Sequence, residues 1–469
     1  MDALDSILTE ALKTLRPTSE ERRKVQSVIN LVVERVSSKI RNLGVEAEVS
    51  VQGSVAKDTW ISGDKDIDVF IMLPKWLGQE GLEKTGMEIA RYAAGANYIE
   101  GYAEHPYVQA LIEDYRVDIV PCFKVEKPEG LISAVDRTPF HTLFINERLN
   151  DTLRDEVRLL KGFAKGIGVY GAEIKTGGLS GYLCELLTLY YGSFKSTLLA
   201  IAKWKPFKVF VDIQRYYGDL KEPLTQFKQY PLVVIDPVDK RRNVAAALTL
   251  QRMSELIAAS RAFIERPSIT FFKPPPRRSL TVKELEDLLA NHGASVIVIL
   301  TECPKLPPDV LWGQIHKSLE GLVTLLRSYD FNLLRASSWS NEKRWIAFTV
   351  ELESHLIPKV KKHQGPLVTS GSDSINRFLK KHVGSPSVIS GPLIEGDRWV
   401  VFKARPYVDA RKLIMDKLLQ AKLGVYIAEK LSKGFEIYVN DEIKSLHRLG
   451  EDFTKYLASF LDGRPNWLK

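Results

Sequence analysis

The sequence of 469 residues has few cysteines and no long apolar run. Its three cysteines, Cys122, Cys184 and Cys303, are odd in number and far apart, which argues against a disulfide framework and a cysteine-based zinc site. Such usage fits a reducing compartment, so we expect a cytoplasmic protein. No apolar run approaches the roughly 20 residues of a membrane span, and residues 1–16 carry acids instead of an apolar core. We therefore expect neither a membrane span nor a signal peptide.

The composition lacks the bias of disordered or fibrous chains. Hydrophobic residues make up 45% and charged residues 26%, which is usual for globular proteins. Lys and Arg number 66 against 58 Asp and Glu, so the formal net charge is +8. This excess suits a polyanionic partner such as nucleic acid, although solubility alone explains it equally well. The length predicts about three domains.

The first part of the chain alternates helix and strand patterns. Thr18 and Glu21 are spaced as a capping box before an apolar helical pattern that ends at Gly44. A short helical stretch is expected from Gly53 to Trp60. Further spacing predicts a helix over 82–94 and strands over 45–51, 66–73, 107–112 and 115–120, the last closed by Pro121.

Residues 146–266 are mainly helical in pattern, and a mixed pattern follows. The stacked prolines of 274–276 predict a linker, because they fit neither a helix nor a central strand. Basic pairs at 361–362 and 380–381, with three later tryptophans, suit nucleic-acid binding, although solvated surface and core explain them as well. The predicted helices are 150–166, 179–191, 244–264 (capped by Asn243), 281–292 and 311–326, and the predicted strands are 295–301 and the pair 331–340 and 344–352.

Two acids two residues apart carry the sharpest chemical signal. Residues two apart in a strand project to the same face, so Asp66 and Asp68 are expected side by side while Ile67 faces a core. Such carboxylates repel each other unless a cation lies between them, and Mg²⁺ prefers oxygen ligands of this kind. Two exposed acids at the start of a strand remain the plain alternative.

The surroundings of this pair favour a phosphate-binding site. Gly53 and Ser54 lie where a strand hands over to a helix, so backbone N–H groups, the Ser54 hydroxyl and Lys57 can approach a phosphate. Asp118 is flanked by β-branched apolar residues, so its carboxylate is poorly placed for simple solvation. If its strand neighbours that of Asp66, three carboxylates converge in the layout that holds two metal ions about 3.5–4 Å apart. The implied chemistry is nucleotidyl transfer.

At this point the sequence resembles a known family. Residues 53–57 and 66–70 resemble the G-S…D-x-D motif of the DNA polymerase beta nucleotidyltransferase superfamily. More narrowly, the chain resembles the archaeal class I CCA-adding enzymes, densely over 45–275 and more thinly afterwards. The runs that carry this narrower resemblance are 103–107, 117–122, 133–141, 156–161, 169–173, 180–185, 236–243 and 268–274.

The resemblance implies template-independent addition of C, C and A to the 3′ end of tRNA from CTP and ATP. It implies that Asp66, Asp68 and Asp118 bind two Mg²⁺ ions and carry the catalysis. It further implies that Ser54 and Lys57, in the loop begun by Gly53, contact the triphosphate. Some members have Arg at the Lys57 position, and Lys keeps the charge without the bidentate fork.

The resemblance also assigns the remaining nucleotide contacts. His141, Lys161 and Tyr170 match contacts to ribose and phosphate, and Arg242 matches a charged side chain near the incoming base. The residues themselves leave plainer roles open: a structural histidine, a solvated helical face for Lys161 and core packing for Tyr170. His105 precedes a proline and is a candidate for orienting an acid.

We therefore predict an α+β, multi-domain protein. Its parts are a nucleotidyltransferase head (1–145), a helical neck that completes the nucleotide pocket (146–266) and an α/β body for tRNA binding (267–469). The resemblance implies that a tail segment, at about 300–390, is inserted in the body. The resemblance implies that the partners are the acceptor arm of tRNA, CTP, ATP and a second copy of the chain, and no membrane partner is expected. The alternatives are a poly(A) polymerase-like enzyme and a non-catalytic RNA-binding protein with the same fold.

Overall fold

The computed structural model describes residues 3–102, 105–219 and 221–468, so Ala103 and Glu104 of the run 103–107 lie outside it. The chain forms two compact units, Met1–Pro275 with Pro465–Lys469, and Pro276–Arg464. The boundary falls inside the predicted proline linker. None of the helices in the described ranges is long and apolar enough to cross a membrane.

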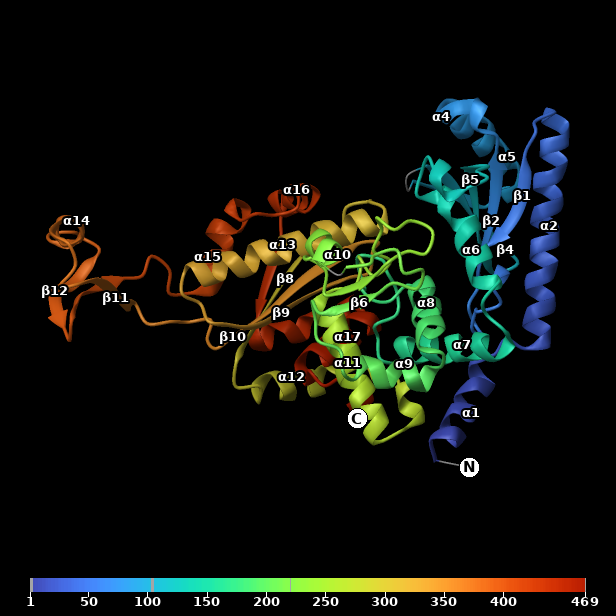
Figure 1. The fold of residues 1–469 in the computed structure, drawn as a ribbon. Coiled ribbons are helices and arrows are strands. Elements are labelled where there is room, and N and C mark those ends of the chain that lie inside the picture. Colours follow the sequence, from blue (N-terminus) through green and yellow to red (C-terminus); the bar gives the residue numbers. More distant parts are fainter. Residues whose placement is uncertain (1–2, 103–104, 220, 469) are drawn as a thin grey trace. The chain divides into compact units, whose positions relative to one another are not determined.

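The first unit alternates helix and strand up to residue 123 and is mainly helical afterwards (Figure 1). Its helices are α1 (Ala3–Leu15), α2 (Ser19–Leu43), α3 (Gly53–Ala56), α4 (Gly78–Gly81), α5 (Met87–Ala94), α6 (Thr138–Asn146), α7 (Asp151–Gly166), α8 (Gly181–Tyr191), α9 (Phe194–Ile201), α10 (Lys221–Gln226) and α11 (Leu250–Glu265). Its strands are β1 (Glu48–Gln52), β2 (Asp66–Leu73), β3 (Tyr98–Tyr102), β4 (Pro106–Ile112), β5 (Tyr115–Phe123), β6 (Val209–Val211) and β7 (Leu232–Val234).

A five-stranded sheet of order β1-β2-β5-β4-β3 forms the scaffold of the site. Its central strands β2 and β5 are parallel, and the other neighbours are antiparallel. The α2 and α5 helices pack together on the sheet, and the inward side chains Ile67, Val69 and Ile71 of β2 are buried there. The predicted capping box of Thr18 and Glu21 is present at the start of α2. One face of β2 therefore packs against the helices, and Asp66 and Asp68 lie on the opposite face of the strand.

The helical part of the first unit is built around aromatic rings. Phe163 of α7 packs against Phe194 of α9, Phe263 of α11 and Phe271, with ring centroids 5.5–5.9 Å apart. Edge-to-face and offset pairs of this kind add to the burial of apolar area. This core fixes the position of α7, which carries several of the predicted site residues. Trp467, near the end of the chain, stacks on Phe271 from outside.

The second unit has a four-stranded sheet of order β14-β8-β10-β9, buried on both faces. The predicted pairing of the strands near 331–340 and 344–352 is confirmed by β9 and β10. A separate three-stranded sheet, β11-β13-β12, packs against α14. The helices are α12 (Val282–Ala290), α13 (Pro308–Ser328), α14 (Ser372–His382), α15 (Ala410–Lys417), α16 (Val425–Lys433) and α17 (Glu451–Asp462). The strands are β8 (Ser295–Glu302), β9 (Leu333–Ser340), β10 (Trp345–Leu352), β11 (Val360–Leu367), β12 (Val388–Glu395), β13 (Arg398–Ala404) and β14 (Glu436–Val439).

Three local predictions are wrong. Pro121 does not close its strand, because β5 continues to Phe123 with Pro121 paired to Ile71 in the parallel register. Asn243 does not cap a helix, since its side chain bonds the backbone of Leu232 and Val234 instead, and Thr249 caps α11. The short helix after Gly53 ends at Ala56 and does not reach Trp60. For Pro121 the pairing with β2, and for Asn243 the bonds to β7, override the local pattern.

The end of α7 offers a test of how closely the helical core is packed. A Cβ at Gly166 would lie 2.0 Å from the carbonyl oxygen of Phe271. Ala is favoured over Gly inside a helix by about 1 kcal/mol, but the backbone clash should outweigh this gain. We expect Gly166→Ala to lower the free energy of unfolding by about 2–3 kcal/mol in guanidinium titrations. Gly218→Ala, where a Cβ meets nothing within 4 Å, is the control and should change it little. Equal effects in the two variants would contradict the packing argument.

Candidate active site

The three predicted acids lie on the two parallel central strands of the sheet. Asp66 and Asp68 are on β2, and Asp118 is on β5 directly opposite Asp68 in the register. The neighbouring Ile67 and Ile119 are buried on the other face, as the alternation predicts. Two strands that run in the same direction therefore bring Asp68 and Asp118 together, and Asp66 joins them from the exposed start of β2.

Burial and mutual repulsion shape the charges of these acids. Burial, and then the nearby Asp118, raise the pKa of Asp68 to about 6. Burial also raises the pKa of Asp118, although the hydrogen bond from Gln109 Nε2, at 2.7 Å, works against it. A buried carboxylate with a raised pKa beside a second acid is typical of a functional site, and a bound cation would offset the repulsion between the two acids.

Gly53 lies against this pair. It has φ +71°, a left-handed conformation that favours glycine. A Cβ built on it would stand 1.8 Å from Asp68 Oδ2, so no other residue fits without moving that carboxylate. Gln52, just before it, pairs with Asp68 across β1 and β2. The predicted closeness of the glycine–serine loop to the acids is therefore present.

The acids offer the donor chemistry that a divalent cation requires, and two of them, Asp66 and Asp118, are bonded to other side chains. Asp66 Oδ1 pairs with Arg116 Nη2 at 2.9 Å, and Asp118 accepts from Gln109. Within the described ranges, no three acidic, histidine or cysteine side chains stand ready to enclose an ion by themselves. Oxygen ligands on Asp68 and Asp118 fit Mg²⁺, and further ligands would have to come from a bound triphosphate and from Asp66 once released from Arg116.

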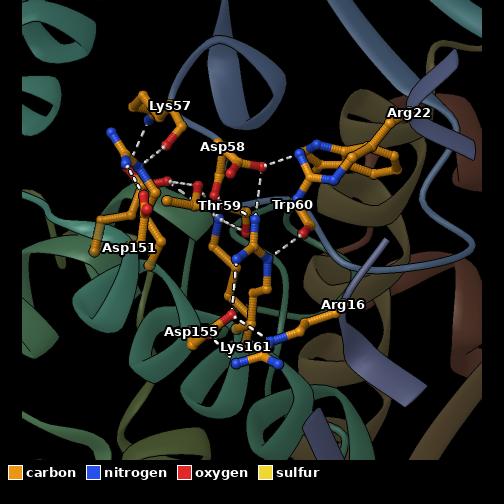
Figure 2. A network of polar contacts seen from close by, with 12 residues as sticks. Arg16, Arg22, Lys57, Asp58, Thr59, Trp60, Asp151, Asp155 and Lys161 are labelled. Atoms are coloured by element: carbon orange, nitrogen blue, oxygen red, sulfur yellow. Dashed lines mark hydrogen bonds and ion pairs between the residues drawn. The ribbon is translucent and has the colours of Figure 1, made fainter. Parts of the chain in front are cut away.

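The loop that follows the glycine–serine turn is fastened to α7 (Figure 2). Arg158 donates to the carbonyl oxygens of Asp58 and Trp60, at 2.5 and 3.1 Å. Lys161 donates to the carbonyl oxygen of Thr59 at 3.1 Å. Arg16, directly after α1, and Asp155 of α7 extend the charged network. The backbone of residues 58–60 is thus held by two cations of α7.

Lys161 does not lie on a solvated face. Its side chain is 1% exposed, and its ammonium group also bonds Thr59 Oγ1 at 2.9 Å and Glu185 Oε1 at 3.1 Å. Lys57, 7% exposed, bonds the other oxygen of Glu185 at 2.6 Å. Burial lowers the pKa of Lys161, whereas the two lysines hold the pKa of Glu185 at about 2 against the effect of its burial. The two predicted phosphate contacts therefore share one buried counter-ion.

His141 and Arg242 meet at a second buried acid. His141 Nε2 lies 2.9 Å from Asp236 Oδ2, and Arg242 Nη1 donates to the same oxygen at 2.7 Å. The His141 ring stacks on Tyr182 at 4.2 Å, and Tyr182 in turn lies 5.3 Å from the Lys57 ammonium. Burial would raise the pKa of Asp236, but its bond with His141 and the charge of Arg242 keep it low. Burial lowers the pKa of His141, so the imidazole is neutral at neutral pH.

The remaining predicted contacts are placed as follows. Tyr170 lies beside the start of α8, where a Cβ at Gly181 would stand 3.0 Å from its hydroxyl and 3.4 Å from Lys161 Nζ. Tyr170 therefore adjoins the lysine cluster. His105 is buried with its Nδ1 2.9 Å from Gln79 Nε2, and the residue that holds Asp118 is Gln109. The expectation that His105 orients an acid is wrong.

A pocket of about 690 Å³ opens beside Asp239, between the loop that carries Arg137 and the turn at 238–241. A second hollow of about 480 Å³ shares Arg137 and Arg241 with it and is also lined by Arg242. Arg137 pairs with Asp239 at 3.1 Å across the first pocket. Basic side chains thus line the space next to the Asp236 cluster.

Four residues that matter here were not singled out from the sequence: Thr59, Tyr182, Glu185 and Asp236. Glu185 and Asp236 are 0% exposed; Glu185 is an isolated acid in an apolar run, and Asp236 directly follows the apolar run 231–235. The same signal identified Asp118, so a search for lone acids in apolar runs would have found Glu185. Thr59 and Tyr182 carry no such signal.

Comparison with known proteins extends these observations along the chain. Three family profiles match successive parts. Residues 29–141 match a nucleotidyltransferase domain, residues 155–273 the second domain of tRNA nucleotidyltransferase, and residues 292–440 the C-terminal domain of CCA-adding enzyme.

Whole-length relatives agree with the profiles. The chain is 38% identical over 455 residues to a CCA-adding enzyme of Methanosarcina barkeri, covering 96% of this chain and 97% of that protein. It is 37% identical over 460 residues to one of Methanothermobacter thermautotrophicus, with the same coverage. A structure of a cytoplasmic RNA terminal U-transferase aligns with 59% of this chain and 100% of its own at a TM-score of 0.47 and 15% identity.

The similarity therefore runs over nearly the whole chain and nearly the whole of each relative. It includes both strands that carry the acids and the helices that carry the buried lysine and its counter-ion. The chain belongs to the family of the archaeal CCA-adding enzymes, the tRNA nucleotidyltransferases that add C, C and A to the 3′ end of tRNA.

Proposed function

We propose that CCA addition takes place at the Asp66, Asp68 and Asp118 cluster and depends on two Mg²⁺ ions held there. The observation that carries this proposal is the in-register pair of Asp68 and Asp118 on parallel strands, with the backbone of Gly53 against Asp68. Bound Mg²⁺ would neutralise charge on the triphosphate and lower the pKa of the attacking hydroxyl.

The protein's own groups bind and orient the nucleotide. Ser54 and the backbone at Gly53 donate to the phosphates, and Lys57 and Lys161 supply positive charge from behind them. The 3′ oxygen of tRNA attacks the α-phosphorus, the bond to the β-phosphate oxygen breaks and pyrophosphate leaves. We assign the hydroxyl proton to Asp118, whose raised pKa suits a proton acceptor.

The second buried acid organises the other end of the nucleotide. His141 and Tyr170 approach the ribose and phosphates, and Arg242 approaches the base of CTP or ATP. Asp236 fixes the directions of both His141 and Arg242, because it bonds the two side chains at once. The basic pocket beside Arg137 is the place we assign to the acceptor end of tRNA.

The small sheet of the second unit is the proposed contact for the tRNA duplex. Lys380 and Lys381 are exposed on α14, and burial together with the charge of Lys403 lowers the pKa of His363 and His382. A-form RNA is recognised through its shape and phosphates, which such a surface suits. A homodimer, which the family resemblance suggests, and a cytoplasmic location, which the cysteine usage suggests, are also part of this proposal.

The direct test uses tRNA transcripts that end before C, after C and after CC, each with CTP, ATP or both, and sizes the products on a gel. We expect two C and then one A, followed by a halt. Asp68→Asn and Asp118→Asn should lower kcat at least about 100-fold and leave tRNA binding unchanged, since the loss falls on metal-assisted chemistry. Asp114→Asn, in the turn between β4 and β5, is the control. Runs of A on any RNA, or full turnover in both variants, would refute the proposal.

The contact between Gly53 and Asp68 gives a second test. Gly53→Ala must displace the Asp68 carboxylate, and a shift of this size should lower kcat about 100-fold. Gly63→Ala is the matched control, because Gly63 also has a positive φ, of +83°, but a Cβ there meets nothing within 4 Å. Equal activity of the two variants would show that the close approach is irrelevant to catalysis.

The raised pKa of Asp68 predicts a pH dependence of known sign. Ion binding requires the ionised carboxylate, so Mg²⁺-dependent ATP binding should weaken about tenfold per unit below pH 6. Without metal, the stability of the fold has the opposite pH dependence. The Asp68 carboxyl binds its proton more tightly in the folded state than in the unfolded state, so the free energy of unfolding falls as the pH rises from about 4 to about 6. Calorimetry and thermal unfolding measure the two trends. Asp68→Asn should remove both, and their persistence in that variant would place the titration elsewhere.

A further inference from the structure

Arg242 lies at the end of a closed loop. Ile235 and Asn243 form an antiparallel bridge at the base of the loop, and the backbone N–H of Asp236 donates to the carbonyl oxygen of Arg242 at 3.0 Å. Residues 236–242, here called the Arg242 loop, therefore start and end at neighbouring points. The bridge fixes the two ends of the loop and leaves the residues between them to other contacts.

Two consecutive tyrosines of another segment hold the middle of the Arg242 loop. The hydroxyl of Tyr216 donates to the carbonyl oxygen of Pro237 at 2.5 Å, and the hydroxyl of Tyr217 donates to the carbonyl oxygen of Lys240 at 2.8 Å. Burial raises the pKa of both phenols, so each keeps the proton that it donates at neutral pH. Both hydroxyls therefore act as donors to the loop.

The stretch held by the tyrosines also holds the backbone of Arg242. The backbone N–H of Arg242 donates to the carbonyl oxygen of Asp239 at 2.9 Å, and Asp239 lies between the two residues that the tyrosines bond. The side chain of Asp239 pairs with Arg137 at 3.1 Å. A shift of residues 237–240 therefore shifts the backbone from which the Arg242 side chain extends.

A turn in the chain brings both hydroxyls to the same loop. Successive side chains of an extended segment point to opposite sides, whereas these two reach one target. Arg215, directly before them, has φ +53°, a left-handed conformation that is uncommon outside glycine, and the backbone N–H of Tyr217 donates to Asp212 Oδ2 at 3.0 Å. The Tyr217 ring packs against Phe210 of β6. Backbone strain of this kind is concentrated at functional sites, where the surrounding structure maintains it.

We propose that Tyr216 and Tyr217 are positioning residues for base selection: their hydroxyls fix the Arg242 loop and thereby the direction in which Arg242 meets the incoming base. An arginine offers only donors, so a well-directed Arg242 favours C and A, whose ring nitrogens at the Watson–Crick edge are acceptors. The corresponding ring nitrogens of U and G carry hydrogen and are disfavoured. This inference rests on the proposed function, since it assumes that Arg242 approaches the base.

The first test measures selection as the ratio of kcat/KM for CTP to that for UTP, on tRNA that ends before the first C. Tyr216→Phe/Tyr217→Phe keeps both rings and removes both donors, so this ratio should fall about tenfold. The loss should appear in KM for CTP, because the acids are untouched. A merely structural role would lower both activities equally, and an unchanged ratio, or a loss confined to kcat, would overturn the inference.

A second comparison tests whether the tyrosines act through Arg242. Arg242→Gln should itself lower the ratio, and adding Tyr216→Phe/Tyr217→Phe should lower it less than about twofold further, because the side chain that the loop directs is gone. A full tenfold further loss would overturn the inference. Tyr407→Phe is the matched control: it removes a hydroxyl that donates to Asp416 at 3.1 Å in the second unit, and it should leave the ratio unchanged.

The third test needs no substrate. Lys240 and Arg241 are exposed trypsin sites, and the bond after Lys240 includes the carbonyl group that Tyr217 holds. Since cleavage requires local opening, Tyr217→Phe should speed cleavage after Lys240 about fivefold in the full chain, whereas Tyr407→Phe should not. Equal rates of cleavage in the two variants would overturn the inference, because the hydroxyl would then not hold the loop.

The two proposals fail separately. A wild type that adds no C to tRNA refutes the proposed function. A wild type that adds C, C and A, while Tyr216→Phe/Tyr217→Phe keeps the full ratio of CTP to UTP, refutes the role of the tyrosines alone.

Discussion

The site depends on one constraint, the attachment of the backbone at residues 58–60 to the cations of α7. Three successive carbonyl oxygens accept hydrogen bonds from Arg158 and Lys161, both of them buried. Charge-assisted hydrogen bonds are the stronger kind, and a buried cation left without acceptors is costly. This attachment joins the sheet that carries the acids to the helices that carry the counter-ions. It also limits the positions of Gly53 and Lys57, which come shortly before residues 58–60 in the chain.

Two buried acids, Glu185 and Asp236, each orient a separate group of side chains. Glu185 gathers the lysines next to the carboxylates, and Asp236 gathers His141 and Arg242 next to the basic pocket. The stacked ring of Tyr182 lies between the two groups, in contact with His141 and near Lys57. Because the interior excludes water, each acid holds its partners more firmly than a surface ion pair would.

The sequence predicted the parts of this arrangement that depend on local pattern. The capping box of α2, the bounds of β2 and the shared face of Asp66 and Asp68 follow from spacing alone, and the structure confirms them. The strand β3 was not predicted, because its residues lie at the sheet edge and show no alternation of burial. The buried state of Lys161 was not predicted either, since its acceptors come from residues 59 and 185. Contacts between distant segments leave no periodic signal.

The burial of all three cysteines has a practical consequence. Burial raises the pKa of Cys122, and that of Cys184 to about 12, so neither offers a thiolate at neutral pH. Cys303 is shielded in the same way. The three cysteines of the native protein should therefore react very little with thiol-directed reagents. A single cysteine introduced on the exposed face of α14 would take up a fluorophore almost alone, which makes the encounter with RNA observable without altering the residues that bind the nucleotide.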